Sequence, residues 1–188
     1  MDVMTANARD VIIESAFRLF VERGYDATSL ARILESVPYS KGAVYHHFAN
    51  KEALLDAVIE RFFTAQLTSN SVSRPHDAAG LAHLMVDEYV DAIDAVAPFA
   101  TPLAYYAFLS SVAARASEAI RAAHDVTAAE LAGALHSEGV PTSQARHLAR
   151  DLIALVEGTG LLTVLWGEGP DRDELHAAAD RFLSLASR

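Results

Sequence analysis

Apolar residues recur every three or four positions along most of this chain, and this spacing predicts amphipathic helices. In the first sixty residues, four such stripes are separated by residues that favour helix ends, with Gly24 placed as a stop. The predicted caps at the helix starts are Asn7, Thr28 or Ser29, Ser40 and Asn50. Strict alternation of apolar and polar residues, which is typical of a half-buried strand, is scarce. The expected fold class is therefore all-α.

The stripes are longer in the second part of the chain. A Ser- and Thr-rich stretch, Thr68–His76, is the predicted linker. Beyond it we expect a helix over 81–96, a second beginning near residue 101, a separate third ending before Gly139, a fourth opening at Thr142 or Ser143, and a last one after Pro170. The predicted organisation is an amino-terminal helical module of residues 1–50, a connecting helix over 50–67, and a helical bundle over 68–188.

The charge distribution limits the classes of partner. The net charge is −10, and the acid excess lies mainly in the second part, because residues 1–68 carry seven Lys/Arg against nine Asp/Glu and the rest carry eight against sixteen. A non-specific polyanion binder is therefore not expected. A specific DNA reader remains compatible with this charge, because it needs a few well-placed contacts and not a basic average.

Two further features concern the compartment. The chain has no cysteine, which excludes disulfides and thiolate metal sites and leads us to expect a cytoplasmic protein. The longest uncharged run, residues 95–114, contains Pro98 and Pro102, so we expect no membrane span.

The stretch Ser29–Phe48 holds two short helical patterns with a break between them. On the second helix, Lys41 and Tyr45 share one row with Gly42 and His46 beside it, whereas Val44 and Phe48 point the other way. One face can pack while the other offers donors, acceptors and flat rings of the kind used at base edges. Two interpretations fit this pattern: a DNA-reading helix-turn-helix, or a corner between core helices in which Tyr45 and the histidines are half-buried.

The residues themselves carry a resemblance. "AFRLFVERGYDATSLARIL" followed by "SKGAVYHHFANKEALLDAV" resembles the DNA-binding region of TetR-family transcriptional regulators over residues 8–60. The resemblance implies a homodimeric regulator, usually a repressor, that binds double-stranded operator DNA and is released by a small-molecule effector. It implies neither an enzyme nor a cofactor. A helical hydrolase or small-molecule binder that kept a DNA-like corner, and a helical adaptor, are the alternatives; motifs such as a nucleophile elbow or a phosphate loop are missing.

Carried over by position, the resemblance implies two sets of DNA contacts. The set facing the major groove is Lys41, Gly42, Ala43, Tyr45 and His46. The set holding phosphates is Thr28, His47 and Lys51, of which Thr28 and Lys51 lie at predicted helix starts that favour an anion. For His47, the helical phase leaves open a partly buried position beside Val44 and Phe48. A metal site formed by the two neighbouring histidines is not expected, because adjacent helix positions point in different directions.

The turn departs from the family pattern. Where the family commonly has "AAGVS", this chain has "SVPYS", residues Ser36–Ser40, and Leu34 replaces a usually small residue. Proline cannot adopt the positive φ that glycine allows, so the turn must follow another backbone path or start the third helix differently.

The second part offers two weaker hypotheses. A ligand pocket is predicted around the aromatic segment near the two prolines, with residues Met85, Tyr89, Phe99, Tyr105, Tyr106, Phe108, His124 and Thr127. The alternative is that these rings are ordinary core. The last two long helices resemble the dimerisation pair of the family, with Leu155, Leu162, Trp166, Phe182 and Leu185 as predicted contacts, although packing within one chain also accounts for them. No histidine spacing in this part predicts a metal site.

Overall fold

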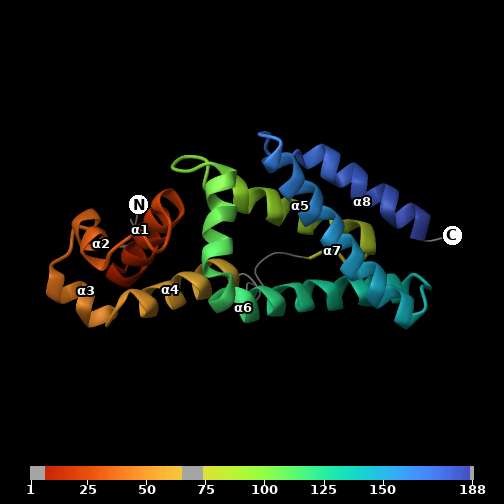
Figure 1. Ribbon diagram of the computed structural model, residues 1–188. Helices are drawn as coiled ribbons and strands as arrows, with labels where there is room; N and C mark the ends of the chain where they lie inside the picture. Colours follow the sequence, from red (N-terminus) through yellow and green to blue (C-terminus); the bar gives the residue numbers. More distant parts are fainter. Residues whose placement is uncertain (1–6, 65–73, 187–188) are drawn as a thin grey trace, which may run out of the picture. The chain divides into compact units, whose positions relative to one another are not determined.

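The computed structural model describes residues 7–64 and 74–186, and all regular structure within these ranges is helical (Figure 1). The elements are α1 (Ala8–Arg23), α2 (Leu30–Ser36), α3 (Lys41–His47), α4 (Lys51–Ile59), the π-helical turn η1 (Glu60–Thr64), α5 (Ala78–Asp94), α6 (Pro102–Ser137), α7 (Thr142–Leu165) and α8 (Arg172–Ala186). The prediction of an all-α fold is confirmed.

The chain packs as two compact units. Unit 1 comprises Met1–Thr68 and Pro98–Ile120, and unit 2 comprises Ser69–Ala97 and Arg121–Arg188. Helix α6 contributes its first part to unit 1 and its second part to unit 2. These units describe packing alone, so the functional boundary at residue 68 stays a prediction.

Short polar side chains start the helices of unit 1, as the sequence predicts. The side-chain oxygens of the four caps accept hydrogen bonds from backbone N–H groups two or three residues ahead: Asn7 from Arg9 at 3.3 Å, Ser29 from Arg32 at 3.2 Å, Ser40 from Ala43 at 3.3 Å and Asn50 from Ala53 at 2.7 Å. Ser29, and not Thr28, therefore caps α2. Gly24 follows the end of α1 with φ of 86°, a conformation that glycine adopts without a steric penalty.

Helix α6 corrects one prediction. The sequence predicts two helices between residue 101 and Gly139, whereas the structure has one continuous helix over Pro102–Ser137. Neither glycine nor proline occurs between Pro102 and Gly133, so no residue there breaks the backbone pattern. Serine hydroxyls turn back onto the same helix, as in Ser111, whose Oγ donates to the carbonyl of Phe108 at 2.7 Å. Most of the predicted linker, residues 68–73, lies outside the described residues.

Aromatic rings form much of the core of unit 1. The ring of Phe17 on α1 stacks on Phe62 with centroids 4.1 Å apart. Edge-to-face contacts of 6.0–6.5 Å join the same ring to Phe99, Tyr105 and Phe108. The aromatic segment that precedes and opens α6 is thus packed against α1.

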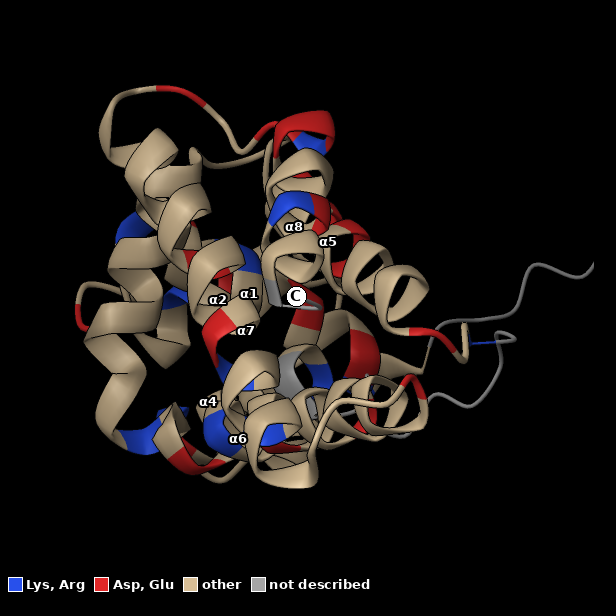
Figure 2. Ribbon diagram, turned by 90° about the vertical axis from the view of Figure 1, so that its right-hand side faces the viewer, with Lys and Arg blue, Asp and Glu red and all other residues tan. Residues whose placement is uncertain are grey.

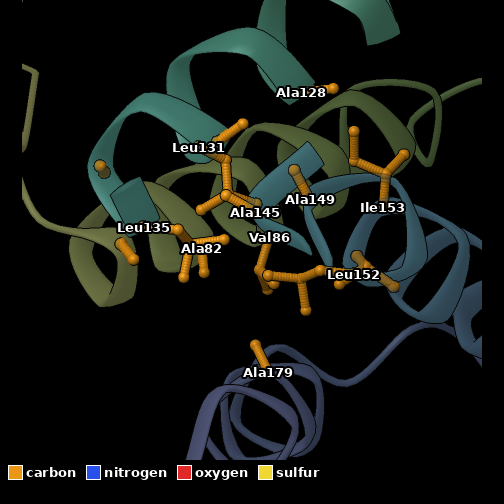
Figure 3. Close-up of a cluster of buried hydrophobic side chains, with 14 of the residues drawn as sticks. Ala82, Val86, Ala128, Leu131, Leu135, Ala145, Ala149, Leu152, Ile153 and Ala179 are labelled. Carbon is orange, nitrogen blue, oxygen red and sulfur yellow. The ribbon is translucent and has the colours of Figure 1, made fainter. Parts of the chain in front are cut away.

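Alanines allow the helices of unit 2 to pack closely (Figure 3). Ala145 and Ala149 on α7 are fully buried, and Figure 3 shows them among Leu131 of α6 and Val86 of α5. On the same helix, Gly160 is buried beneath Tyr89 of α5, and a methyl group at Gly160 would overlap the phenol ring. The small size of these residues therefore fixes the approach of α5 to α7.

Charged side chains join α5 to α8 at the surface of unit 2. The guanidinium of Arg172 donates to Asp87 at 2.7 Å and to Asp91 at 2.6 Å. Figure 2 shows the acidic residues that gather on these two helices. Such partly exposed pairs add little stability individually, but they orient the two helices.

The described residues contain neither a membrane-spanning helix nor a metal cluster. No helix there combines the length and apolar character needed to cross a membrane. Nor does that part of the chain bring three or more His, Cys, Asp or Glu side chains together in an arrangement that could hold a metal ion.

Candidate nucleic-acid interface

Helix α3 is held by its apolar face. Val44 is fully buried and Phe48, which follows the helix, is 3% exposed. Both residues lie on the side of α3 that packs within unit 1. The guanidinium of Arg9 lies over the Phe48 ring, 5.6 Å from its centroid. The predicted inward orientation of Val44 and Phe48 is confirmed.

The opposite face of α3 is open. Lys41, Gly42, Tyr45 and His46 are exposed, Tyr45 to 44%, and Ala43 is partly exposed. The ammonium of Lys41 lies 5.7 Å from the centre of the Tyr45 ring, near the limit of a cation–π contact. This face presents an ammonium, a phenol and an imidazole side by side, which is not the half-buried arrangement of a core corner.

Gly42 leaves the backbone of this face accessible. A methyl group at Gly42 would meet no atom within 4 Å, so packing inside the protein does not require glycine there. A glycine on an exposed helix lowers helix stability by about 1 kcal/mol relative to alanine. Packing within the fold therefore does not account for this glycine.

The unusual turn before α3 follows an extended path. Helix α2 ends at Ser36, and Val37 has φ of −116° and ψ of 147°. Within the described residues, positive φ values occur only at glycines, so Pro38 occupies the turn without a left-handed residue. Ser40 then caps α3, and the departure from the family turn leaves the start of α3 intact.

His47 lies on the surface. Its side chain is exposed and not partly buried as in the alternative interpretation, although its ring centroid lies 6.3 Å from that of Phe48. Its ring centroid lies 5.4 Å from that of His46 in an edge-to-face arrangement. His47 is thus available to a partner at the rim of the face formed by α3.

Lys51 begins α4 and also organises the loop after α1. Its Nζ donates to the carbonyl of Tyr25 at 3.0 Å and lies 4.1 Å from the centre of the Tyr25 ring. Burial, followed by the negative charge of Glu52, raises the pKa of the Tyr25 phenol. Lys51 therefore has a structural contact in addition to its predicted phosphate contact.

Thr28 does not suit its predicted role. Its side chain is fully buried, and its hydroxyl lies 2.9 Å from the carbonyl of Gly24 and 3.1 Å from that of Leu19. A threonine placed in this way locks the end of α1 to the start of α2 and has no surface for a phosphate. Thr28 is therefore not available to a phosphate at the surface.

One contact near this interface was not predicted. Arg115 of α6 donates two hydrogen bonds to the carboxylate of Asp56 on α4, at 2.5 and 2.6 Å. This hydrogen bond is the main reason that the pKa of Asp56 lies below its usual value. The two residues are 59 positions apart, and no local pattern in the sequence links them.

The amino-terminal helices match a known family. The family model for "Bacterial regulatory proteins, tetR family" matches residues 12–58, which contain α2, α3 and most of α1 and α4. This amino-terminal segment of the chain is therefore TetR-like.

Sequence relatives support the TetR likeness. The chain is 42% identical over 52 residues to the HTH-type transcriptional repressor AcnR of Corynebacterium efficiens, covering 28% of each protein. It is 42% identical over 55 residues to the icaADBC negative regulator IcaR of Staphylococcus epidermidis, covering 29% of this chain and 30% of that protein. With the regulator UidR of Escherichia coli K12 the identity is 33% over 106 residues, covering 46% of this chain and 54% of that protein. The matched segments thus span between about a quarter and a half of these relatives.

Solved structures extend the TetR likeness to the whole fold. A transcriptional regulator from Aquifex aeolicus VF5 matches with a TM-score of 0.71 at 21% identity, covering 95% of this chain and 99% of that one. A TetR-family regulator from Streptomyces coelicolor matches with a TM-score of 0.68 at 24% identity, covering 98% and 82%. At such identities the likeness concerns the fold alone.

The residues predicted for the ligand pocket are divided between the units. Phe99, Tyr105, Tyr106 and Phe108 belong to unit 1, where at least three of them pack on α1. Met85, Tyr89, His124 and Thr127 belong to unit 2 and are partly buried. The core interpretation fits Phe108, which is 1% exposed. The pocket itself stays a prediction.

His124 has a defined partner among these residues. Its Nε2 lies 2.7 Å from Oε1 of Glu157 on α7. This hydrogen bond raises the pKa of the imidazole in spite of partial burial. His124 is thus a link between α6 and α7 within unit 2.

The residues predicted for the TetR-type dimer lie largely on the surface. Leu162 on α7 is 48% exposed, Trp166 just beyond α7 is 70% exposed and Leu185 on α8 is 68% exposed. Leu155 and Phe182 are partly buried against the core of unit 2. Large apolar side chains with this exposure lose contact with water only if another surface covers them.

Proposed function

We propose that this TetR-like protein is a homodimeric DNA-binding regulator of transcription, a repressor that a small molecule releases from its operator. The observation that carries the proposal is the open face of α3, anchored by Val44 and Phe48 and lying within the segment that matches the family. Lys41, Gly42, Ala43, Tyr45 and His46 are assigned to the major groove. His47 and Lys51 are assigned to phosphates at its edge.

The dimer follows from the geometry of double-stranded operators. Two copies of α3 read two half-sites about 34 Å apart, or somewhat more. The exposed apolar residues Leu162, Trp166 and Leu185 are assigned to the contact between subunits, with Leu155 and Phe182 behind them. In this proposal residues 1–50 bind DNA, and residues 68–188 bind the effector and the second subunit. Residues 50–67 connect these two parts.

Release by an effector requires a connection to the DNA-binding helices. The Arg115–Asp56 pair ties α6 to α4, which directly follows the module that contains α3. A shift of α6 that breaks or redirects this pair alters the position of α4. A 100-fold loss of operator affinity corresponds to a coupling free energy of only about 2.7 kcal/mol.

The proposal is tested by binding to DNA from the promoter region of its own gene, compared with a scrambled duplex of equal length at several salt concentrations. We expect the first duplex to bind at least about a thousandfold more tightly, with both affinities falling as salt rises. Equal affinity for the two duplexes would contradict a specific regulator. Identical operator affinity with and without the true inducer would refute the release mechanism alone.

Two variants separate base reading from phosphate contact. Tyr45→Ala is expected to weaken the cognate duplex by about tenfold or more and the scrambled duplex much less. Lys51→Ala is expected to weaken both duplexes and to reduce the salt slope by up to about 0.9. Leu103→Ala, an exposed change on α6, is the control. Because Lys51 also bonds to the carbonyl of Tyr25, thermal unfolding of each variant is measured first.

A further inference from the structure

An open groove lies between α6 and α7 on the surface of unit 2. It has a volume of about 740 Å³, within the usual range of small-molecule sites. A second hollow of about 520 Å³ shares Asp125, Ala128 and Arg150 with it and extends toward His124 and Glu157. Neither hollow includes the aromatic residues predicted for the ligand pocket.

The floor of the groove is made of small residues of α6. They recur at helical spacing and comprise Ala128, Ala129, Ala132 and Gly133. A methyl group at Gly133 would meet no atom within 4 Å, so the space above it is open. An apolar ligand body can therefore lie directly on methyl groups and bare backbone.

The wall of the groove is a polar and cationic face of α7. Ser143, Arg146, His147 and Arg150 follow one another at spacings of three, one and three residues, which places them on one side of the helix. Among the described residues Arg146 has no ion-pair partner. Arg150 pairs with Asp125 at 3.3 Å, but its side chain is 73% exposed, and an exposed pair of this kind is easily displaced.

The sign of the charge in the groove is opposite to that of its surroundings. Unit 2 contains seven arginines and no lysine against fifteen acidic residues. Elsewhere in this unit Arg74 and Arg172 each lie between two carboxylates. The groove instead brings two arginines and two histidines together with only one carboxylate, that of Asp125. This local reversal favours an anion over a cation.

The start of α7 adds donors at one end of the groove. Pro141 occupies the cap position and supplies no side-chain hydrogen bond, which leaves N–H groups of the first turn without the side-chain acceptor seen at α1 to α4. The hydroxyls of Thr142 and Ser143 line the groove at this end. Donors of this kind reinforce the preference for an anion that the arginines establish.

We propose that the α6–α7 groove binds a small organic anion. Its carboxylate or phosphate group contacts Arg146 and Arg150, and its apolar part lies over Ala129, Ala132 and Gly133. Binding displaces the Asp125 carboxylate from Arg150. The site goes beyond the proposed regulatory function, since it requires neither DNA binding nor the aromatic residues 99–108.

The test compares two fluorescent probes that share one apolar body, using the full chain. 1-Anilinonaphthalene-8-sulfonate carries an anionic group, and N-phenyl-1-naphthylamine lacks it. We expect saturable binding of the sulfonate, weakened about tenfold or more in the double variant Arg146→Gln/Arg150→Gln, with the neutral probe unchanged. Arg181→Gln, an exposed change on α8, is the matched control and should have no effect.

A second variant tests the floor independently of charge. Gly133→Leu fills open space and leaves the fold intact, so it should block the sulfonate while thermal unfolding is unchanged. Two results would overturn the site. One is an affinity for the sulfonate that is the same in all variants, and the other is an equal loss of affinity for both probes in the arginine double variant. Operator binding is measured on the same samples, so failure of the groove and failure of the regulator assignment are read separately.

Discussion

The outer face of α3 and the aromatic segment 99–108 are both predicted as binding surfaces, yet their surroundings in the structure differ. Tyr45 is 44% exposed on a helix whose other side is buried, whereas Phe108 is 1% exposed and packs on Phe17 and Phe20. The first surface was inferred from the two faces of one helix. The second was inferred from composition, which does not say which way a ring points. Helical phase is therefore the stronger guide to which side chains are exposed.

The largest expected effect is a difference in the free energy of unfolding between variants with buried rings removed and a variant of the open face. Phe48→Ala and Phe108→Ala each remove a buried ring and should lower the free energy of unfolding by about 3 kcal/mol or more. Tyr45→Ala, on the open face, should change it by less than about 1 kcal/mol. Denaturant titration measures all three. If Phe108→Ala leaves stability unchanged, the segment is a pocket wall and is not core as its burial indicates.

The next effect extends the comparison to the exposed apolar residues near the carboxyl end. Trp166→Glu should weaken self-association about 100-fold, or about 2.7 kcal/mol, because it places a charge in the proposed subunit contact. Leu103→Glu, an equally drastic change at a residue that is 52% exposed in unit 1, is the control. Sedimentation velocity over a range of concentrations gives both dissociation constants. An unchanged dimer in the first variant would remove Trp166 from the interface.

A smaller effect on stability tests the close packing of α7. It compares substitutions at two glycines of this helix. Gly160→Ala forces a methyl group into the Tyr89 ring and should cost about 1–3 kcal/mol of stability. Gly158→Ala meets no atom within 4 Å and should gain up to about 1 kcal/mol through helix propensity. Thermal or denaturant unfolding of the two variants measures both changes in stability. Equal changes in the two variants would mean that Tyr89 moves aside freely.

The smallest expected effect concerns the His124–Glu157 link. The pKa of His124 in the folded protein is raised above 6.5, so its contribution is fully present below that value and is lost as the pH rises through the raised pKa. His124→Gln should therefore destabilise the protein at about pH 5, by no more than about 1 kcal/mol for so exposed a pair, and hardly at all at about pH 9. His147→Gln is the control. A loss of stability in His124→Gln that grows as the pH rises would contradict the assigned hydrogen bond.

Much of unit 1 could be predicted from the sequence. The caps at Asn7, Ser40 and Asn50 and the inward orientation of Val44 depend on residues three or four positions apart, and the structure confirms them. The continuous helix α6 was not predicted, although the lack of glycine and proline after Pro102 was a usable signal. The cationic face of α7 also had a signal, since Arg146, His147 and Arg150 share one helical side.

The sequence by itself determined helices α1 to α4, their polar starts and the two faces of α3, because these depend on neighbours within one or two turns. Only the tertiary structure decided that Thr28 turns its hydroxyl inward and that Arg115 binds Asp56. It alone placed the cationic side of α7 beside the alanine side of α6. Contacts of this kind join helices that are far apart in the chain, and their geometry depends on packing that no local pattern encodes.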